Sequence, residues 1–138
     1  MRLYRDNFRA SASHATPYAI LATHAVCADS DAEAERLAAT VDLNVVRRAK
    51  GEYLPLAAPA EAAAYAYTPV DRARIAQNRT RMAVGSPATV LARLKPLIES
   101  TKVDELMVTT MIFDHSARKH SYQLLAQAFD LVIPGRGL

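Results

Sequence analysis

A strand that leads straight into a capped helix is encoded by one stretch of the sequence, Pro17-Tyr-Ala-Ile-Leu-Ala-Thr-His-Ala-Val-Cys-Ala-Asp-Ser-Asp-Ala-Glu-Ala-Glu-Arg-Leu-Ala38. Residues 18–27 carry apolar side chains on both alternating faces, which is typical of a strand buried on both sides of a parallel sheet. Ser30 and Glu33 then have the spacing of a capping box, and Gly51 supplies the helix stop. A strand followed by such a helix is half of a βαβ unit.

The segment after this helix predicts an excursion followed by another helix. Residues 52–68 are rich in proline, alanine and tyrosine, which favours irregular chain with a short helix. Thr68 before Pro69 resembles a helix start with proline at the first helical position, and it predicts a helix over about 69–78.

The last third of the sequence predicts a helix, a strand and a closing helix. Val84-Gly-Ser-Pro87 predicts a helix start with Ser86 as its cap, and Pro96 predicts a kink or an early end. Residues 104–113 predict a second buried strand, and Asp114 caps the final helix. This alternation of strands and helices predicts the α/β class.

Length and composition limit the organisation of the chain. Its 138 residues fit one domain, and they are too few for a complete eight-fold βα barrel of about 250 residues. We expect residues 1–16 to form a lead-in segment, residues 17–133 to form the folded body, and residues 134–138 to form a loose tail.

Composition also argues against several classes of protein. Cys27 is the one cysteine, so no disulfide can form within the chain, which fits a cytoplasmic protein. No apolar run is long enough to cross a membrane. The net charge is only +3, and the densest basic stretch is interpreted as a solvated helix face, not a nucleic-acid surface. That stretch contains Arg72, Arg74, Arg79 and Arg81.

Polar residues near the ends of the two predicted strands are the candidates for a functional site, because ligands usually bind at the carboxyl ends of parallel strands. The catalytic candidates are His24, Asp114 and His115. Thr109 and Thr110 are candidates for cofactor binding. Each of the three catalytic candidates has a structural alternative: His24 as a hydrogen-bonded core histidine, Asp114 as a helix cap, and His115 as a solvated first-turn residue.

Gly85 and Ser86 are further candidates for cofactor binding, because a helix N-terminus can hold an anion. The chain has no glycine-rich phosphate loop, no Gly-x-Ser-x-Gly motif, and neither a His pair at i, i+4 spacing nor a Cys cluster. We therefore expect no metal site.

Four blocks of the sequence together resemble the luciferase-like flavin-dependent monooxygenases. Gly85-Ser-Pro-Ala-Thr-Val90 resembles a Gly-Ser-Pro-Glu-Thr-Val helix start in that family, with Ala88 in place of the acidic residue. The other blocks resemble the family's late strand–helix unit, last strand and closing helix, and they are residues 17–38, 104–110 and 114–126.

The resemblance spans about residues 17–130 and covers only the C-terminal portion of the family. It implies a partial (β/α)8 TIM-barrel-like fold that contains the last two strand–helix units. It also implies an oxidoreductase that uses reduced FMN and O2 on an organic substrate such as an aldehyde. Most of the family's flavin contacts come from its N-terminal strands, so the resemblance transfers no flavin ligand to a residue of this chain.

A partial barrel has open strand edges and an apolar inner face, so it requires association. We expect a homo-oligomer, or a partner that supplies the N-terminal barrel half, with residues 18–27 and 104–113 at the interface. The alternative function is a non-catalytic oligomerising remnant or assembly domain.

Overall fold

The computed structural model describes residues 1–131 of the chain. The predicted tail, residues 134–138, lies outside the described residues. The elements in chain order are α1 (Arg2–Asp6), β1 (Ile20–Cys27), α2 (Asp31–Ala49), α3 (Pro59–Ala64), α4 (Pro69–Arg79), β2 (Met82–Gly85), α5 (Pro87–Thr101), β3 (Glu105–Thr109) and α6 (His115–Ala128). The α/β class is confirmed.

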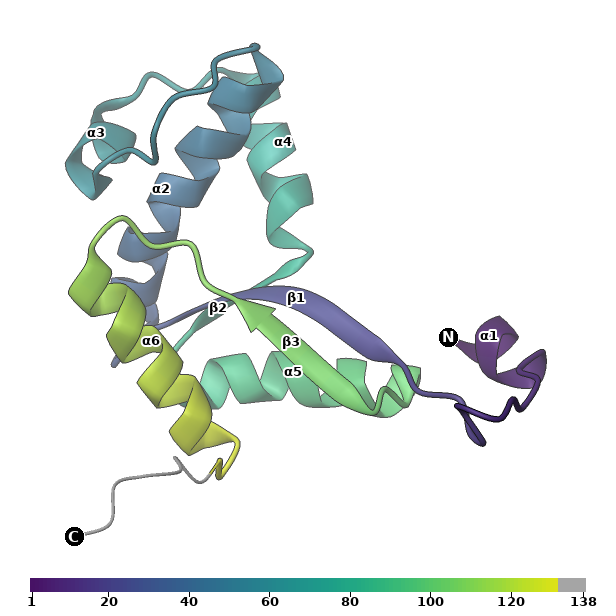
Figure 1. Ribbon diagram of the computed structural model, residues 1–138. Helices are drawn as coiled ribbons and strands as arrows, with labels where there is room; N and C mark the ends of the chain where they lie inside the picture. Colours follow the sequence, from purple (N-terminus) through teal and green to yellow (C-terminus); the bar gives the residue numbers. More distant parts are fainter. Residues whose placement is uncertain (132–138) are drawn as a thin grey trace, which may run out of the picture.

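The three strands form one parallel sheet in the order β2-β1-β3 (Figure 1). β3 pairs with the amino-terminal part of β1, where His24 lies opposite Thr109. β2 pairs with the carboxyl-terminal part of β1, where His24 lies opposite Met82. Among the described residues, the first half of β1 therefore has a strand on only one side, and the outer edge of β3 has none.

Two predictions about strands are corrected by this sheet. Val84 and Gly85, which the sequence predicts as part of a helix start, are instead the last two residues of β2. The sequence did not reveal this strand, because its four residues are too few to show a period. The predicted strand over 104–113 ends at Thr109. Beyond it the chain leaves the sheet, and Ile112 enters the core beside α2.

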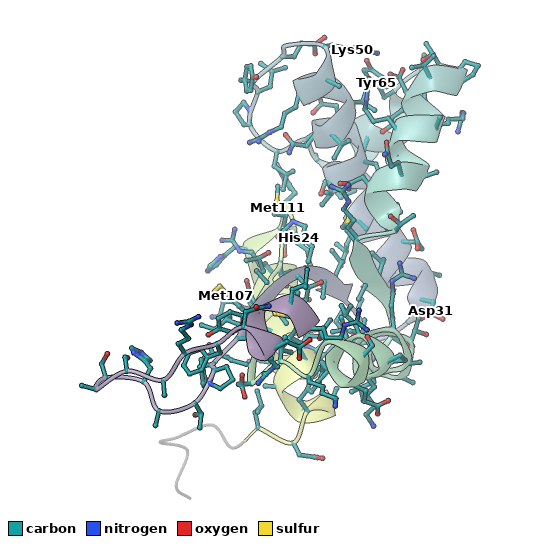
Figure 2. All side chains as sticks on the ribbon, turned by 90° about the vertical axis from the view of Figure 1, so that its right-hand side faces the viewer. His24, Asp31, Lys50, Tyr65, Met107 and Met111 are labelled. Carbon is teal, nitrogen blue, oxygen red and sulfur yellow. The ribbon has the colours of Figure 1, made fainter. Side chains whose placement is uncertain are left out.

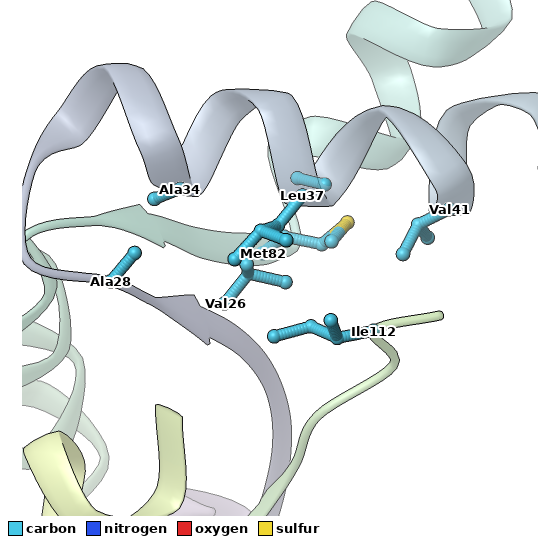
Figure 3. Close-up of a cluster of buried hydrophobic side chains, with 8 residues drawn as sticks. Val26, Ala28, Ala34, Leu37, Val41, Met82 and Ile112 are labelled. Atoms are coloured by element: carbon cyan, nitrogen blue, oxygen red, sulfur yellow. The ribbon is translucent and has the colours of Figure 1, made fainter. Parts of the chain in front are cut away.

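Helices pack on both faces of the sheet: α2, with α3 and α4 beyond it, lies on one side, and α5 and α6 lie on the other (Figure 1). On the α2 side, Val26 and Met82 of the strands meet Leu37 and Val41 of the helix, with Ile112 closing the cluster (Figure 3). On the opposite side, the buried residues are Ala25, Cys27, Ala83, Val90, Leu94 and Leu125.

The predicted helix starts are largely confirmed by their caps. Ser30 Oγ accepts a hydrogen bond from the Glu33 N–H, but the Glu33 carboxylate pairs with Arg36, so only half of the predicted capping box forms. Thr68 and Asp71 form a complete capping box at the start of α4, and Asp114 caps α6.

Pro96 does not end α5, so the predicted early end is wrong. The helix continues to Thr101 and closes at Lys102, whose φ of 50° is left-handed. Pro96 and Ala92 are both exposed, so water can bind the Ala92 carbonyl that proline leaves without a donor.

The lead-in segment contains the short helix α1 and is fastened to the start of the sheet. Arg5 forms an ion pair with Asp104 at 2.7 Å, and the same carboxylate accepts the Ala19 N–H at 2.8 Å. The bond from Ala19, assisted by Arg5, lowers the pKa of Asp104. These contacts join the amino-terminal ends of β1 and β3.

Candidate functional site

Residues 1–131 leave one face of the sheet uncovered along the first half of β1 and along β3. Ile20 is 47% exposed and Met107 is 49% exposed. Ala22, the direct register partner of Met107, is also exposed. The other face of β3 points its Leu106 and Val108 toward α5 and α6. Large apolar side chains exposed together on a parallel sheet are unusual, because such sheets are normally covered on both faces.

The carboxyl end of this open face carries a polar pair that joins two sequence candidates. His24 Nδ1 lies 2.5 Å from Thr109 Oγ1, and Thr109 Oγ1 lies 3.3 Å from the Thr23 carbonyl. With its own proton donated to that carbonyl, the Thr109 hydroxyl accepts the His24 Nδ1–H. This network assigns Nε2 as the unprotonated ring nitrogen of neutral His24.

Two methionines flank the histidine on this side of the molecule. Figure 2 shows His24 between Met107 on β3 and Met111 on the segment that leads to α6. Phe113 on the same segment is half exposed. Polarisable apolar side chains therefore lie on the same side of the molecule as one hydrogen-bonding ring, which is a common composition for a small-molecule site.

Thr110 turns away from the open face and is buried. Its N–H donates to Tyr122 Oη at 3.0 Å, and its own hydroxyl is buried without a partner among the described residues. Nearby, the Cys27 N–H donates to Ser121 Oγ at 2.9 Å. These bonds hold α6 against the ends of β1 and β3.

Within residues 1–131, neither Asp114 nor His115 forms a hydrogen bond with His24. Asp114 Oδ1 accepts the Ala117 N–H at 2.7 Å, which is the ordinary bond of a helix cap. His115 Nδ1 lies 2.9 Å from Arg118 one turn later. Asp114 therefore makes the cap that its structural alternative predicts, whereas the contact of His115 with Arg118 was not predicted.

The anion at Gly85 and Ser86 is the side-chain carboxylate of Asp31, which belongs to the same chain. The Ser86 N–H donates to Asp31 Oδ1 at 2.6 Å, and the Ser86 and Thr89 hydroxyls lie 3.1 Å apart beside it. The bond from the Ser86 N–H, assisted by the two hydroxyls, lowers the pKa of Asp31. The N-terminus of α5 is thus already neutralised by a carboxylate.

Acid is expected to destabilise the fold through carboxylates bound to backbone N–H groups, and Asp31 is the best case. Its pKa in the folded state lies below the ordinary value of 3.8. The stability it contributes is therefore complete above that value and is lost as the pH falls through the folded-state pKa. Between about pH 5 and about pH 2.5, the midpoint temperature of unfolding should fall less for the Asp31→Asn variant than for the parent chain.

Thermal unfolding followed by circular dichroism at several pH values measures this difference. Glu52→Gln, at an exposed loop position, is the matched control for net charge. Equal acid sensitivity of the parent chain and both variants would contradict the assigned role of Asp31.

Sequence reasoning did not find a second pair at the same end of the sheet. His120 Nε2 lies 3.0 and 3.1 Å from the two oxygens of Asp29, and this bond raises the pKa of His120. The two residues are 91 positions apart, so no local pattern could have paired them. Burial, together with the charge of Asp29, raises the pKa of Cys27 to about 11, which removes it as a nucleophile at neutral pH.

Residues 1–131 contain no cluster of metal-ligating side chains. None of the helices in this part of the chain is long and apolar enough to span a membrane.

No family model matches the chain, but individual relatives do. The chain is 34% identical over 124 residues to a luciferase-like monooxygenase of Escherichia coli K12, covering 90% of this chain and 37% of that protein. It is 41% identical over 128 residues to the uncharacterised Bacillus subtilis protein YceB, covering 93% of this chain and 39% of the relative. The resemblance to the luciferase-like monooxygenases that the sequence predicts is thereby confirmed, over about two fifths of the length of these proteins.

The solved structure of apo-MsnO8 has the same fold over nearly the whole chain. The TM-score is 0.84 at 33% identity, and the match covers 95% of this chain and 40% of MsnO8. The chain thus spans about two fifths of the length of each protein that it matches. The open sheet face and free strand edges are what a part of a larger luciferase-like fold would present.

Proposed function

We propose that this chain is the C-terminal part of a flavin-dependent luciferase-like monooxygenase, an oxidoreductase that acts on an organic substrate such as an aldehyde. The observation that carries the proposal is the uncovered face of β1 and β3, which is apolar along Ile20, Ala22 and Met107 and ends in the His24–Thr109 pair. In the proposed assembly this face lines the interior of a TIM-barrel-like fold, and its polar end is the carboxyl end of the strands, where barrel enzymes place their chemistry.

The open sheet face and the N-termini of α5 and α6 fit the ring system of FMN better than they fit its phosphate. The flat apolar face suits an aromatic ring, and His24 offers one hydrogen bond at its edge. The N-termini of α5 and α6 are both capped by carboxylates, Asp31 and Asp114, which repel a phosphate. When bound, reduced FMN supplies the electrons that activate O2.

His24 is the residue of this chain that we assign to the site. Thr109 is a positioning residue, because it holds His24 Nδ1–H and directs Nε2 as an acceptor. Nε2 can then accept a hydrogen bond or a proton from a bound molecule. Ile20, Met107 and Met111 would exclude water from the same surface. Asp114 and His115 stay candidates from the segment that follows β3.

The proposal also includes a covering partner. Within the described part of the chain, residues 20–23 of β1 have a free edge. Beside it lies a hollow of about 550 Å³, whose lining includes Leu94 and Leu97 together with Arg81 and Arg93. An unpaired edge next to apolar side chains is a template for another strand and its helix. We propose that a second copy of the chain, or a chain with the N-terminal strand–helix units, occupies it.

Titration of FMN tests the proposed function. The fluorescence of FMN should change in a saturable manner when the chain is added, either as its own oligomer or mixed with the N-terminal portion of a luciferase-like monooxygenase. Riboflavin in parallel shows whether the ring alone is bound. Absence of binding at tens of micromolar in every mixture would retire the flavin function and would favour the non-catalytic assembly domain.

The His24→Ala variant is expected to weaken flavin or substrate binding in the competent mixture by about fivefold to tenfold, the usual effect of one lost hydrogen bond. His14→Ala, in the exposed lead-in segment, is the matched control and should leave the binding curve unchanged. Equal affinities of the parent chain and the His24 variant would remove His24 from the site.

A further inference from the structure

The four arginines of the basic stretch have different surroundings in the structure. Arg79 donates to Asp42 through two nitrogens at 2.8 Å and also pairs with Glu35 at 3.1 Å. The guanidinium of Arg72 lies over the ring of Tyr67, 5.9 Å from its centroid. The basic stretch is therefore not a uniform charged face, because two of its four charges have partners within the chain.

Arg74 and Arg81 face a common hollow instead. This hollow, of about 270 Å³, lies on the C-terminal half of α4 against α2, and its lining residues are Val45, Arg74, Gln77, Asn78 and Arg81. We call it the arginine notch. Its lining contains no carboxylate, and no ion pair to Arg74 or Arg81 occurs among residues 1–131. The excess positive charge of the notch is thus uncompensated by the described part of the chain.

The chemistry of the lining selects an anion. Two guanidinium groups and two side-chain amides provide N–H donors. Asn78 Nδ2 donates to the sulfur of Met82 at 3.2 Å, and a thioether sulfur is a weak acceptor. Guanidinium groups match the tetrahedral oxygens of phosphate in a bidentate manner. The volume is below the usual range for drug-sized ligands, roughly 300–1,000 Å³, and suits one phosphate group with part of its substituent.

The position of the notch connects it with the open sheet face. Arg81 directly precedes Met82, which lies opposite His24 in the sheet. Arg81 also lines the hollow beside the free edge of β1, together with Ala22 and Thr23. A molecule held by its phosphate at Arg81 therefore lies at the border of the surface that contains His24.

We propose that the arginine notch is a binding site for a phosphate monoester dianion, held by Arg74 and Arg81 with support from Gln77 and Asn78. The phosphate has two possible sources, a free phosphate-bearing metabolite or the phosphate end of FMN. The site does not depend on the flavin function, because its residues do not belong to the open sheet face.

Titration with inorganic phosphate and phenyl phosphate at constant ionic strength tests the site, with the arginine side-chain ¹⁵N–¹H resonances as the readout. The resonances of Arg74 and Arg81 should shift in a saturable manner. Arg74→Ala and Arg81→Ala should each weaken binding by about tenfold, as expected for a lost charge-assisted hydrogen bond. Arg74→Lys should recover only part of the affinity, because lysine keeps the charge but cannot donate the two parallel hydrogen bonds of a guanidinium group.

Arg72→Ala is the matched control, because it removes the same charge from the same helix outside the notch. It should leave the affinity within about twofold. An equal loss in all three alanine variants, or no saturable shift with either phosphate, would overturn the site. Circular dichroism of each variant verifies that the fold is intact.

A second arm separates the two sources of phosphate. FMN and riboflavin are added to the parent chain in the presence and absence of phenyl phosphate. Competition between phenyl phosphate and FMN, with riboflavin unaffected, assigns the notch to the flavin phosphate. Phenyl phosphate binding without such competition assigns it to a separate metabolite. The notch can thus be confirmed even if flavin binding fails.

Discussion

Replacement of Leu94 by alanine is expected to lower the free energy of unfolding by about 2–5 kcal/mol. Leu94 is 1% exposed and lies in the cluster that joins α5 to the strands and to α6. Loss of its side chain removes buried apolar surface and leaves a cavity between the sheet and two helices, which can close only if a helix moves. Urea denaturation measures the change from the shift of the midpoint at constant slope.

Leu97 on the same helix is the matched control. It is 37% exposed and lines the hollow beside the free edge of β1. Leu97→Ala should lower the free energy of unfolding of the isolated chain by less than about 1 kcal/mol. In the proposed assembly the same variant should weaken association. Equal destabilisation by the two substitutions would contradict the described packing of α5.

Replacement of Gly85 by alanine is expected to lower the free energy of unfolding by about 2–4 kcal/mol, through combined backbone strain and overpacking. Gly85 has φ +150°, and a Cβ there would lie 2.5 Å from Thr89 Cγ2 and 2.7 Å from Asp31 Oδ1. The added methyl group would separate Asp31 from the Ser86 N–H. The end of β2 and the start of α5 would both be affected.

Gly51→Ala separates these contributions in the same denaturation experiment. Gly51 also has a positive φ, of +80°, but a Cβ there would meet nothing within 4 Å. Its cost should be about 1 kcal/mol, the ordinary penalty of a side chain in this conformation. A Gly85 variant as stable as the Gly51 variant would show that the close contact among Gly85, Thr89 and Asp31 is not important.

The elements that could be predicted from sequence are those with strong local signals. The caps at Ser30, Thr68 and Asp114 lie within a few residues of what they determine, and the structure confirms them. The apolar run 18–27 does form a strand, β1, but its predicted burial on both faces is wrong for the first half, where Ile20 and Ala22 are exposed. β2 has only four residues and depends on its pairing with β1, so it can be recognised only from the tertiary structure. The tolerance of Pro96 likewise depends on which side of α5 faces solvent.

The candidate site shows the same division. His24 and Thr109 could be proposed separately, because each lies near the end of a predicted strand, but their contact depends on the register between β1 and β3. The carboxylate at the N-terminus of α5 comes from Asp31, 55 residues away from Ser86. The division of the basic stretch into paired and unpaired arginines also required the positions of Asp42 and Tyr67.

The central claim is that the open face and free edges of this sheet are an interior surface that another chain or copy covers. Light scattering coupled to size-exclusion chromatography at micromolar concentration tests it most directly, because it gives the mass of the particle in solution. We expect a folded particle of at least twice the 15.1 kDa mass of one chain. Leu97→Ala should shift it toward lower mass. A compact, folded monomer of 15.1 kDa, both alone and after mixing with the N-terminal portion of a luciferase-like monooxygenase, would contradict the claim.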